Sequence, residues 1–84
     1  MAIKQLPEAK KEWQVASVWQ FISEWKLEKQ YKKLYGNDFY KDWDTGNCLA
    51  DSEIIYALLK DMKGSWTSEY VDDNNMGYFI IKKY

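Results

Sequence analysis

The sequence predicts an α+β fold, in which helices come first and a β-hairpin comes last. Two observations carry this prediction: apolar residues recur at helical spacing between residues 51 and 63, and they alternate with polar residues from residue 66 onward. Of the 84 residues, 46% are hydrophobic and 30% are charged, a balance typical of a folded domain. We therefore expect one small globular domain over residues 1–84. The hairpin is expected to pack on the helices, because an isolated hairpin is only marginally stable.

The N-terminal region is expected to be helical over residues 8–35, where the residue types favour a helix. Pro7 suits the first turn of a helix, and Gly36 is a typical helix terminator. The apolar residues of this region fall on two opposite faces. The helix is therefore expected either to break near residues 23–26 or to be covered from several sides.

A competing interpretation of the same region starts with a short strand over residues 12–16. Ser17 would then cap the helix that follows, with Gln20 three residues later completing a capping box. We favour a helix throughout.

Downstream, residues 36–48 are predicted to form a loop, because glycine, asparagine and aspartate surround its aromatic residues. A second, amphipathic helix is expected to begin at Asp51 and to end at Gly64. Its apolar stripe consists of Ile54, Ile55, Leu58, Leu59 and Met62. Two strands then flank a predicted turn over residues 72–77.

The residue composition speaks against catalysis. Histidine is absent, which removes the commonest general base, the commonest metal ligand and every nucleophile–histidine pair. Cys48 is the only cysteine, which excludes an internal disulfide, and it has no nearby cation that would activate its thiol. We therefore expect no enzyme, no cofactor and no metal site.

Calcium binding is the one metal chemistry that a motif suggests. The stretch from Asp42 to Glu53 partly resembles the calcium-binding loop of EF-hand proteins, with Asp44 at the third position. Two positions depart from the pattern: Gly46 stands where an acid or amide is expected, and Asn47 where glycine makes the sharp turn. A plain acidic loop before a helix is the simpler interpretation.

Charge and aromatic residues suggest a protein-binding surface. The net charge is −1, but residues 1–37 carry seven lysines against four acids, whereas residues 38–84 carry five lysines against nine acids. Aromatic residues make up 18% of the chain, and exposed tryptophan and tyrosine often anchor interfaces. The candidate partner-binding residues combine these two features: Asp38, Tyr40, Asp42, Trp43, Asp44, Asp72 and Asp73.

These observations favour a small non-catalytic inhibitor that covers a basic surface of a nucleic-acid enzyme or toxin. Phage and mobile-element proteins of the anti-defence type, such as anti-CRISPR proteins, and toxin-immunity proteins are of this kind. We expect it in the cytoplasm, that of the host cell if a phage encodes it, because no apolar run could span a membrane and none follows Met1 as a signal peptide would. A homodimer through the first helix is possible, since Trp13, Trp19 and Trp25 would spread around it.

The alternative is a DNA-binding regulator that resembles winged-helix proteins in the order of its elements, helices followed by a terminal hairpin. Lys82 and Lys83 could then contact phosphate. Three features argue against it: the acidic hairpin turn, the lack of net charge on the second helix, and the absence of arginine, since all twelve basic residues are lysine. Direct nucleic-acid binding is therefore not expected.

Overall fold

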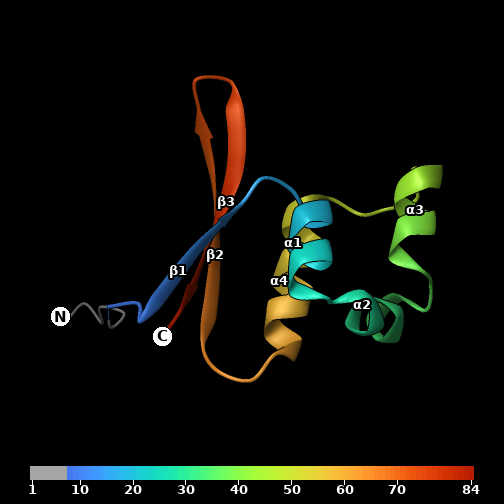
Figure 1. Ribbon diagram of the computed structural model, residues 1–84, viewed down its shortest axis with the longest axis horizontal. Coiled ribbons are helices and arrows are strands. Elements are labelled where there is room, and N and C mark those ends of the chain that lie inside the picture. The colour runs from blue at the N-terminus through green and yellow to red at the C-terminus, as the bar shows by residue number, and fades with distance from the viewer. Residues whose placement is uncertain (1–7) are drawn as a thin grey trace, which may run out of the picture.

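The computed structural model describes residues 8–84, within which four helices and a three-stranded antiparallel sheet confirm the predicted α+β fold (Figure 1). In chain order the elements are β1 (Lys11–Val15), α1 (Val18–Trp25), α2 (Glu28–Tyr35), α3 (Phe39–Thr45), α4 (Asp51–Asp61), β2 (Trp66–Asp73) and β3 (Met76–Lys83). The helix start predicted at Pro7 lies outside the described residues.

The helices lie on one side of the sheet, whose strand order is β1-β3-β2 (Figure 1). α4 packs on β2, while α1 lies against both α4 and β1. α2 and α3 pack on each other farther from the sheet, and α2 also contacts α4. The far half of the β2–β3 hairpin extends beyond the helices, so its turn lies at the opposite end of the sheet from the start of β1 and the end of β3 (Figure 1).

The core lies between the sheet and helices α1 and α4. The predicted stripe of α4 is confirmed, because four of its five residues are buried and Met62 packs against them. The sheet contributes alternate residues of β1 and β3, as expected for strands with one covered face. The buried apolar residues are Val15, Val18, Phe21, Ile22, Leu27, Tyr31, Phe39, Ile54, Ile55, Leu58, Leu59, Phe79 and Ile81.

The favoured helix over residues 8–35 is wrong at its start, because residues 11–15 form β1 and the competing interpretation holds there. β1 pairs with β3, with Trp13 opposite Ile81 and Val15 opposite Phe79. This pairing buries Val15 and supplies the backbone hydrogen bonds that a helix would otherwise form. The predicted two-stranded hairpin is thereby extended to three strands.

The predicted Ser17 cap starts α1, but the Gln20 side chain reaches Ala16, one residue before the N-cap, so the pair differs from a capping box in that bond. The Ser17 hydroxyl accepts a hydrogen bond from the Gln20 backbone N–H at 3.3 Å, and the Gln20 side chain accepts one from the Ala16 N–H at 2.6 Å. The predicted break is also confirmed, because α1 ends at Trp25 and Lys26 adopts a left-handed conformation with φ of 54°. Gly36 ends α2 as expected, with φ of 79°.

The loop predicted over residues 36–48 is also wrong in part, because residues 39–45 form the short helix α3. The residues that suggested a loop are its two caps. The Asp38 carboxylate accepts a hydrogen bond from the Lys41 N–H at 3.3 Å, and Gly46 ends the helix with φ of 72°. Phe39 on this helix is fully buried, which anchors it to the core.

The hairpin is confirmed, but its turn is shorter than predicted. Only Asn74 and Asn75 form the turn, with φ of 50° and 65°, the positive values that a two-residue hairpin turn requires. Asp72 and Asp73 belong to β2 rather than to the turn, opposite Gly77 and Met76. Their side chains are therefore fixed on a strand near the hairpin end.

Candidate functional site

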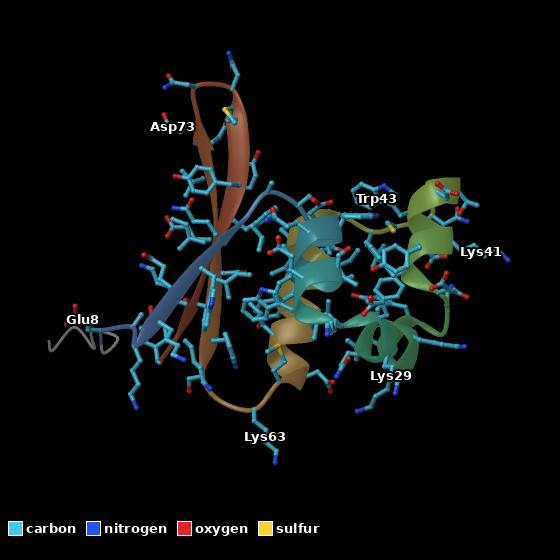
Figure 2. The ribbon with its side chains drawn as sticks, in the orientation of Figure 1. Glu8, Lys29, Lys41, Trp43, Lys63 and Asp73 are labelled. Carbon is cyan, nitrogen blue, oxygen red and sulfur yellow. The ribbon has the colours of Figure 1, made fainter. Side chains whose placement is uncertain are left out.

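The seven predicted partner-binding residues lie in two separate places. Asp38, Tyr40, Asp42, Trp43 and Asp44 belong to α3 and its N-cap, whereas Asp72 and Asp73 lie near the hairpin turn. Figure 2 shows Trp43 beside α3, among the helices. Asp73 lies at the tip of the hairpin, which projects beyond the helices. The structure therefore brings the first five together, and the two hairpin residues do not join them.

The most prominent surface feature near α3 is a group of three aromatic residues, Trp19, Tyr40 and Trp43, here called the aromatic patch. Trp19 of α1 is 44% exposed and Trp43 of α3 is 42% exposed. Tyr40 is half-buried, and its ring lies 5.9 Å from that of Trp19. It precedes Trp43 by three residues on α3, a spacing that makes the two neighbours on the helix surface. The patch thus spans two helices.

Tyr40 holds the patch in place through its hydroxyl. It donates a hydrogen bond to Glu28 Oε2 at 2.9 Å and shares one with Ser23 Oγ at 3.2 Å. Glu28 belongs to α2 and Ser23 to α1, so one tyrosine ties α3 to both neighbouring helices. The ring of Trp43 is in turn 5.9 Å from the buried ring of Phe39. The exposed rings are therefore presented on a supported surface.

Asp38 and Asp44 are the acidic residues that remain exposed on α3, at its N-cap and near its C-terminal end. Lys41 is exposed between them. The charge around the patch is therefore mixed with an acidic excess, which suits a partner with a basic surface.

Asp42 differs from its neighbours because it is only 8% exposed. Its carboxylate accepts a hydrogen bond of 2.8 Å from the Tyr31 hydroxyl of α2. This buried pair joins α2 to α3, so the Asp42 side chain supports the fold beneath the patch and is not on the contact surface.

The surroundings of this pair favour the protonated forms of the Tyr31 hydroxyl and of the nearby Cys48 thiol. Burial raises the pKa of the Tyr31 hydroxyl above the usual value near 10, and the hydrogen bond to Asp42 raises it further. Burial likewise raises the pKa of the half-buried Cys48 thiol, and the nearby carboxylates of Asp42 and Asp51 add to the effect. A protonated thiol is a poorer nucleophile than a thiolate.

The residues of the EF-hand-like stretch do not form one loop. Asp42 and Asp44 lie on α3, and Glu53 lies on α4. Within residues 8–84, no three histidine, cysteine or acidic side chains come together as metal ligands would. The geometry of this stretch is that of two helices with a connection, which differs from a calcium loop.

Lysines gather at the end of the sheet where β1 begins and β3 ends. Lys10, Lys11 and Lys83 line a hollow of about 380 Å³, together with Trp13 and Trp66. The Lys83 ammonium lies 5.3 Å from the centre of the Trp66 ring. Lys82 has its side chain on the opposite face of the sheet, 3.7 Å from Glu12 Oε1.

The three tryptophans of the N-terminal region do not spread around one helix. Trp13 lies on β1, and its ring is 5.0 Å from that of Trp25 and 5.5 Å from that of Trp66. Trp19 alone of the three is among the exposed large hydrophobic residues. The expected arrangement of three tryptophans around one helix, on which the dimer prediction rested, is therefore not observed.

Sequence reasoning did not include Trp19 among the partner-binding residues. It also missed a groove of about 620 Å³ between α4 and β2. The groove is lined by Tyr56 and Leu59 from α4 and by Trp66 and Ser68 from β2, among others. Trp19 could have been found from the spacing, because it lies off the face shared by Val18, Phe21 and Ile22. The groove depends on how the helix and strand sit together, for which the sequence carries no signal.

No family model matches the chain, and no curated protein or solved structure matches it at a significant level. Among residues 8–84, no helix combines the length and the apolar character needed to cross a membrane.

Proposed function

We propose that this chain is a small non-catalytic protein that binds another protein through the aromatic patch and inhibits it. The observation that carries the proposal is the exposure of Trp19 and Trp43 on two helices that Tyr40 locks together. Large aromatic side chains held rigidly at a surface are the usual anchors of protein interfaces, because they bury much area at little cost in conformational entropy.

The proposed partner has a basic surface, such as the nucleic-acid groove of an enzyme or toxin. Asp38 and Asp44 flank the patch and are exposed, so they would attract such a surface and speed association. The net charge of −1 is too small for mimicry of DNA, so the aromatic rings would supply most of the affinity. A phage or mobile-element inhibitor, of the anti-defence or immunity type, acting in the host cytoplasm fits this description.

The absence of histidine and the raised pKa of Cys48 support a non-catalytic role. The partner-binding residues of the proposal are therefore Trp19, Tyr40 and Trp43, with Asp38 and Asp44 at the rim. Asp73 lies at the tip of the hairpin, away from Trp43 (Figure 2), and Asp72 precedes it on β2, so neither belongs to this contact.

The test uses the tagged full-length chain as bait in a bacterial lysate, with the bound proteins quantified by mass spectrometry. A Trp19→Ala/Trp43→Ala variant should lose a basic protein that the unaltered chain captures. Met76→Ala is the matched control, because Met76 is 73% exposed on β3 beside the hairpin turn, outside the patch. The purified partner should then be inhibited by the unaltered chain, and less so by the double variant. Equal capture by the double variant, or a partner whose activity is unaffected, would refute the proposal.

A winged-helix-like DNA-binding regulator is the second candidate. The observation that favours it is the gathering of Lys10, Lys11 and Lys83 at one end of the sheet, next to Trp66. The acidic Asp72 and Asp73 near the hairpin turn oppose it, since they would face the phosphate backbone. Fluorescence anisotropy with random-sequence duplex DNA at about 50 and about 200 mM salt separates the two. Binding that weakens steeply with salt would favour the regulator, and no binding would favour the protein inhibitor.

A further inference from the structure

β2 is a long and regular edge strand. Within residues 8–84, the order β1-β3-β2 leaves one of its sides without a neighbouring strand. Its eight residues pair with β3 one by one, from Trp66 opposite Lys83 to Asp73 opposite Met76, so no bulge interrupts it. The strand also contains no proline. Such an edge offers unpaired backbone groups to another extended chain.

The register shows which backbone groups of β2 are free. In a two-residue hairpin the pair that closes the turn, here Asp73 and Met76, is hydrogen-bonded. At the other end, Ser65 accepts a hydrogen bond from the Tyr84 N–H at 2.9 Å. Both observations show that the backbone N–H and C=O groups of the odd-numbered β2 residues point toward β3. The N–H and C=O groups of the even-numbered residues therefore point away from the sheet: Trp66, Ser68, Tyr70 and Asp72.

A groove lies beside this edge and provides a place for side chains. It has a volume of about 620 Å³ and runs between α4 and β2, with Tyr56 and Leu59 on the helix and Trp66 and Ser68 on the strand. Side chains alternate along a strand, so every second residue of an added strand would enter the groove and the others would lie on the outer face of the sheet. The groove is lined largely by apolar groups, which suits apolar residues.

The charge of β2 determines the character of the added strand. Glu69, Asp72 and Asp73 give the strand three acids, and it has no lysine. Glu69 and Asp73 share the outer face, because they lie opposite Ile80 and Met76 of β3, which alternate with the buried Phe79 and Ile81. Pairing β2 with the β2 of a second copy would bring these acids together, which is unfavourable. Lysine or arginine on the outer face of the added strand would be favourable.

We infer that the edge of β2 is a docking site for an extended segment of another protein, in which basic residues alternate with apolar ones. The segment would add a fourth strand to the sheet through the free backbone groups of β2. Its apolar side chains would enter the groove beside α4, and its basic side chains would lie near Glu69. This site is separate from the aromatic patch, so it stands or falls independently of the proposed inhibitor.

The test measures binding of a fluorescein-labelled nine-residue peptide of alternating lysine and valine, with both ends blocked, to the full chain by fluorescence anisotropy. Ser68→Pro removes one backbone N–H at the open edge of β2. It leaves the hydrogen bonds to β3 in place, because the Ser68 N–H and C=O groups point away from β3. Ser68→Ala is the matched control. We expect Ser68→Pro to raise the Kd about tenfold relative to Ser68→Ala, since a backbone hydrogen bond is lost and the proline ring blocks the edge.

Two further measurements guard against a folding defect and against purely electrostatic binding. Glu69→Lys leaves the backbone unchanged and should also weaken binding of the lysine–valine peptide. A peptide N-methylated at alternate residues, on the side that would face β2, keeps its charge but should bind more weakly.

Three results would overturn the inference. The first is the absence of saturable binding at millimolar peptide. The second is equal affinity of the methylated and unmethylated peptides. The third is self-association of the chain that Ser68→Pro abolishes, which would assign the edge to a second copy.

Discussion

Tyr31→Phe removes a single hydroxyl group and isolates the role of the buried pair beneath the aromatic patch. The Tyr31 hydroxyl donates to the Asp42 carboxylate at 2.8 Å, and both side chains are buried, at 2% and 8% exposure. A hydrogen bond to a charged group contributes about 1.5–3 kcal/mol, and its loss leaves a carboxylate in a poorly solvated site. We expect the free energy of unfolding to fall by about 2 kcal/mol, and Tm by about 10 °C for a domain of this size.

The matched control is Tyr35→Phe. Tyr35 is half-buried on the same helix, its ring lies 4.8 Å from that of Tyr31, and within residues 8–84 the structure gives its hydroxyl no hydrogen bond. Urea denaturation followed by tryptophan fluorescence measures both variants. The control is expected to lose less than about 0.5 kcal/mol. If Tyr31→Phe is as stable as Tyr35→Phe, the pair does not hold α2 to α3 and the reasoning fails.

The pH dependence gives a second measurement on the same variants. The pKa of Tyr31 is raised in the folded state by burial and by Asp42, whereas in the unfolded chain it stays near 10. The stabilisation is therefore complete below pH 10 and is lost as the pH rises above it, because the unfolded chain then releases its proton more readily. Tyr31→Phe lacks this group, so its stability should fall less steeply above pH 10 than that of Tyr35→Phe.

Three further predictions concern the caps, the hairpin and the thiol. Ser17→Ala should lower the free energy of unfolding by about 1 kcal/mol in urea titrations, because the α1 N-cap is lost. Gly77→Ala should cost about 1–3 kcal/mol, because its methyl would meet the ring of Tyr70, and much of that loss should disappear in a Tyr70→Ala background. Cys48 should react with iodoacetamide at pH 8 more slowly in the folded chain than in urea, because burial raises its pKa. An equal rate in both states would contradict this.

The elements that could be predicted are those whose signal is local and repeated. The stripe of Ile54, Ile55 and Leu58 on α4 spans more than one helical turn, and the hairpin alternates over two strands of eight residues each. In α4 burial on one face agrees with the pattern in the sequence, and in β3 the buried Phe79 and Ile81 alternate with less buried residues. Local preference and tertiary packing therefore point to the same structure.

β1 could not be assigned with the same security, because its five residues, KEWQV, include glutamate, lysine and glutamine, which favour helices. Their strand conformation depends on β3, which is more than sixty residues away in sequence, with Lys11 opposite Lys83. A distant partner overrides local preference in such cases. α3 was missed for a different reason: with only seven residues, it is outweighed by the Asp38 and Gly46 that cap it.

For the predicted site, too, the sequence indicated what is local and could not indicate what depends on tertiary packing. Sequence reasoning placed Trp43, Tyr40 and their acidic neighbours correctly on one segment, because they are close in sequence. It could not separate Asp42 from Asp44, since only the helical turn of α3 directs one carboxylate inward to Tyr31 and leaves the other exposed. It also could not connect Trp19 with Tyr40, which lie on different helices.

The pairing of β1 with β3 also changes where the charges lie. By sequence the N-terminal half is basic and the C-terminal half is acidic, which suggests two oppositely charged halves of the molecule. In the structure Lys11 pairs opposite Lys83, so lysines from both ends of the chain meet at one end of the sheet. Asp72 and Asp73 lie at the other end, beside the turn (Figure 2). The charge separation therefore runs along the sheet. A strand added to β2 would place its apolar residues in the groove beside Trp66 and Ser68, and its basic residues near Glu69 and Asp73, toward the hairpin end.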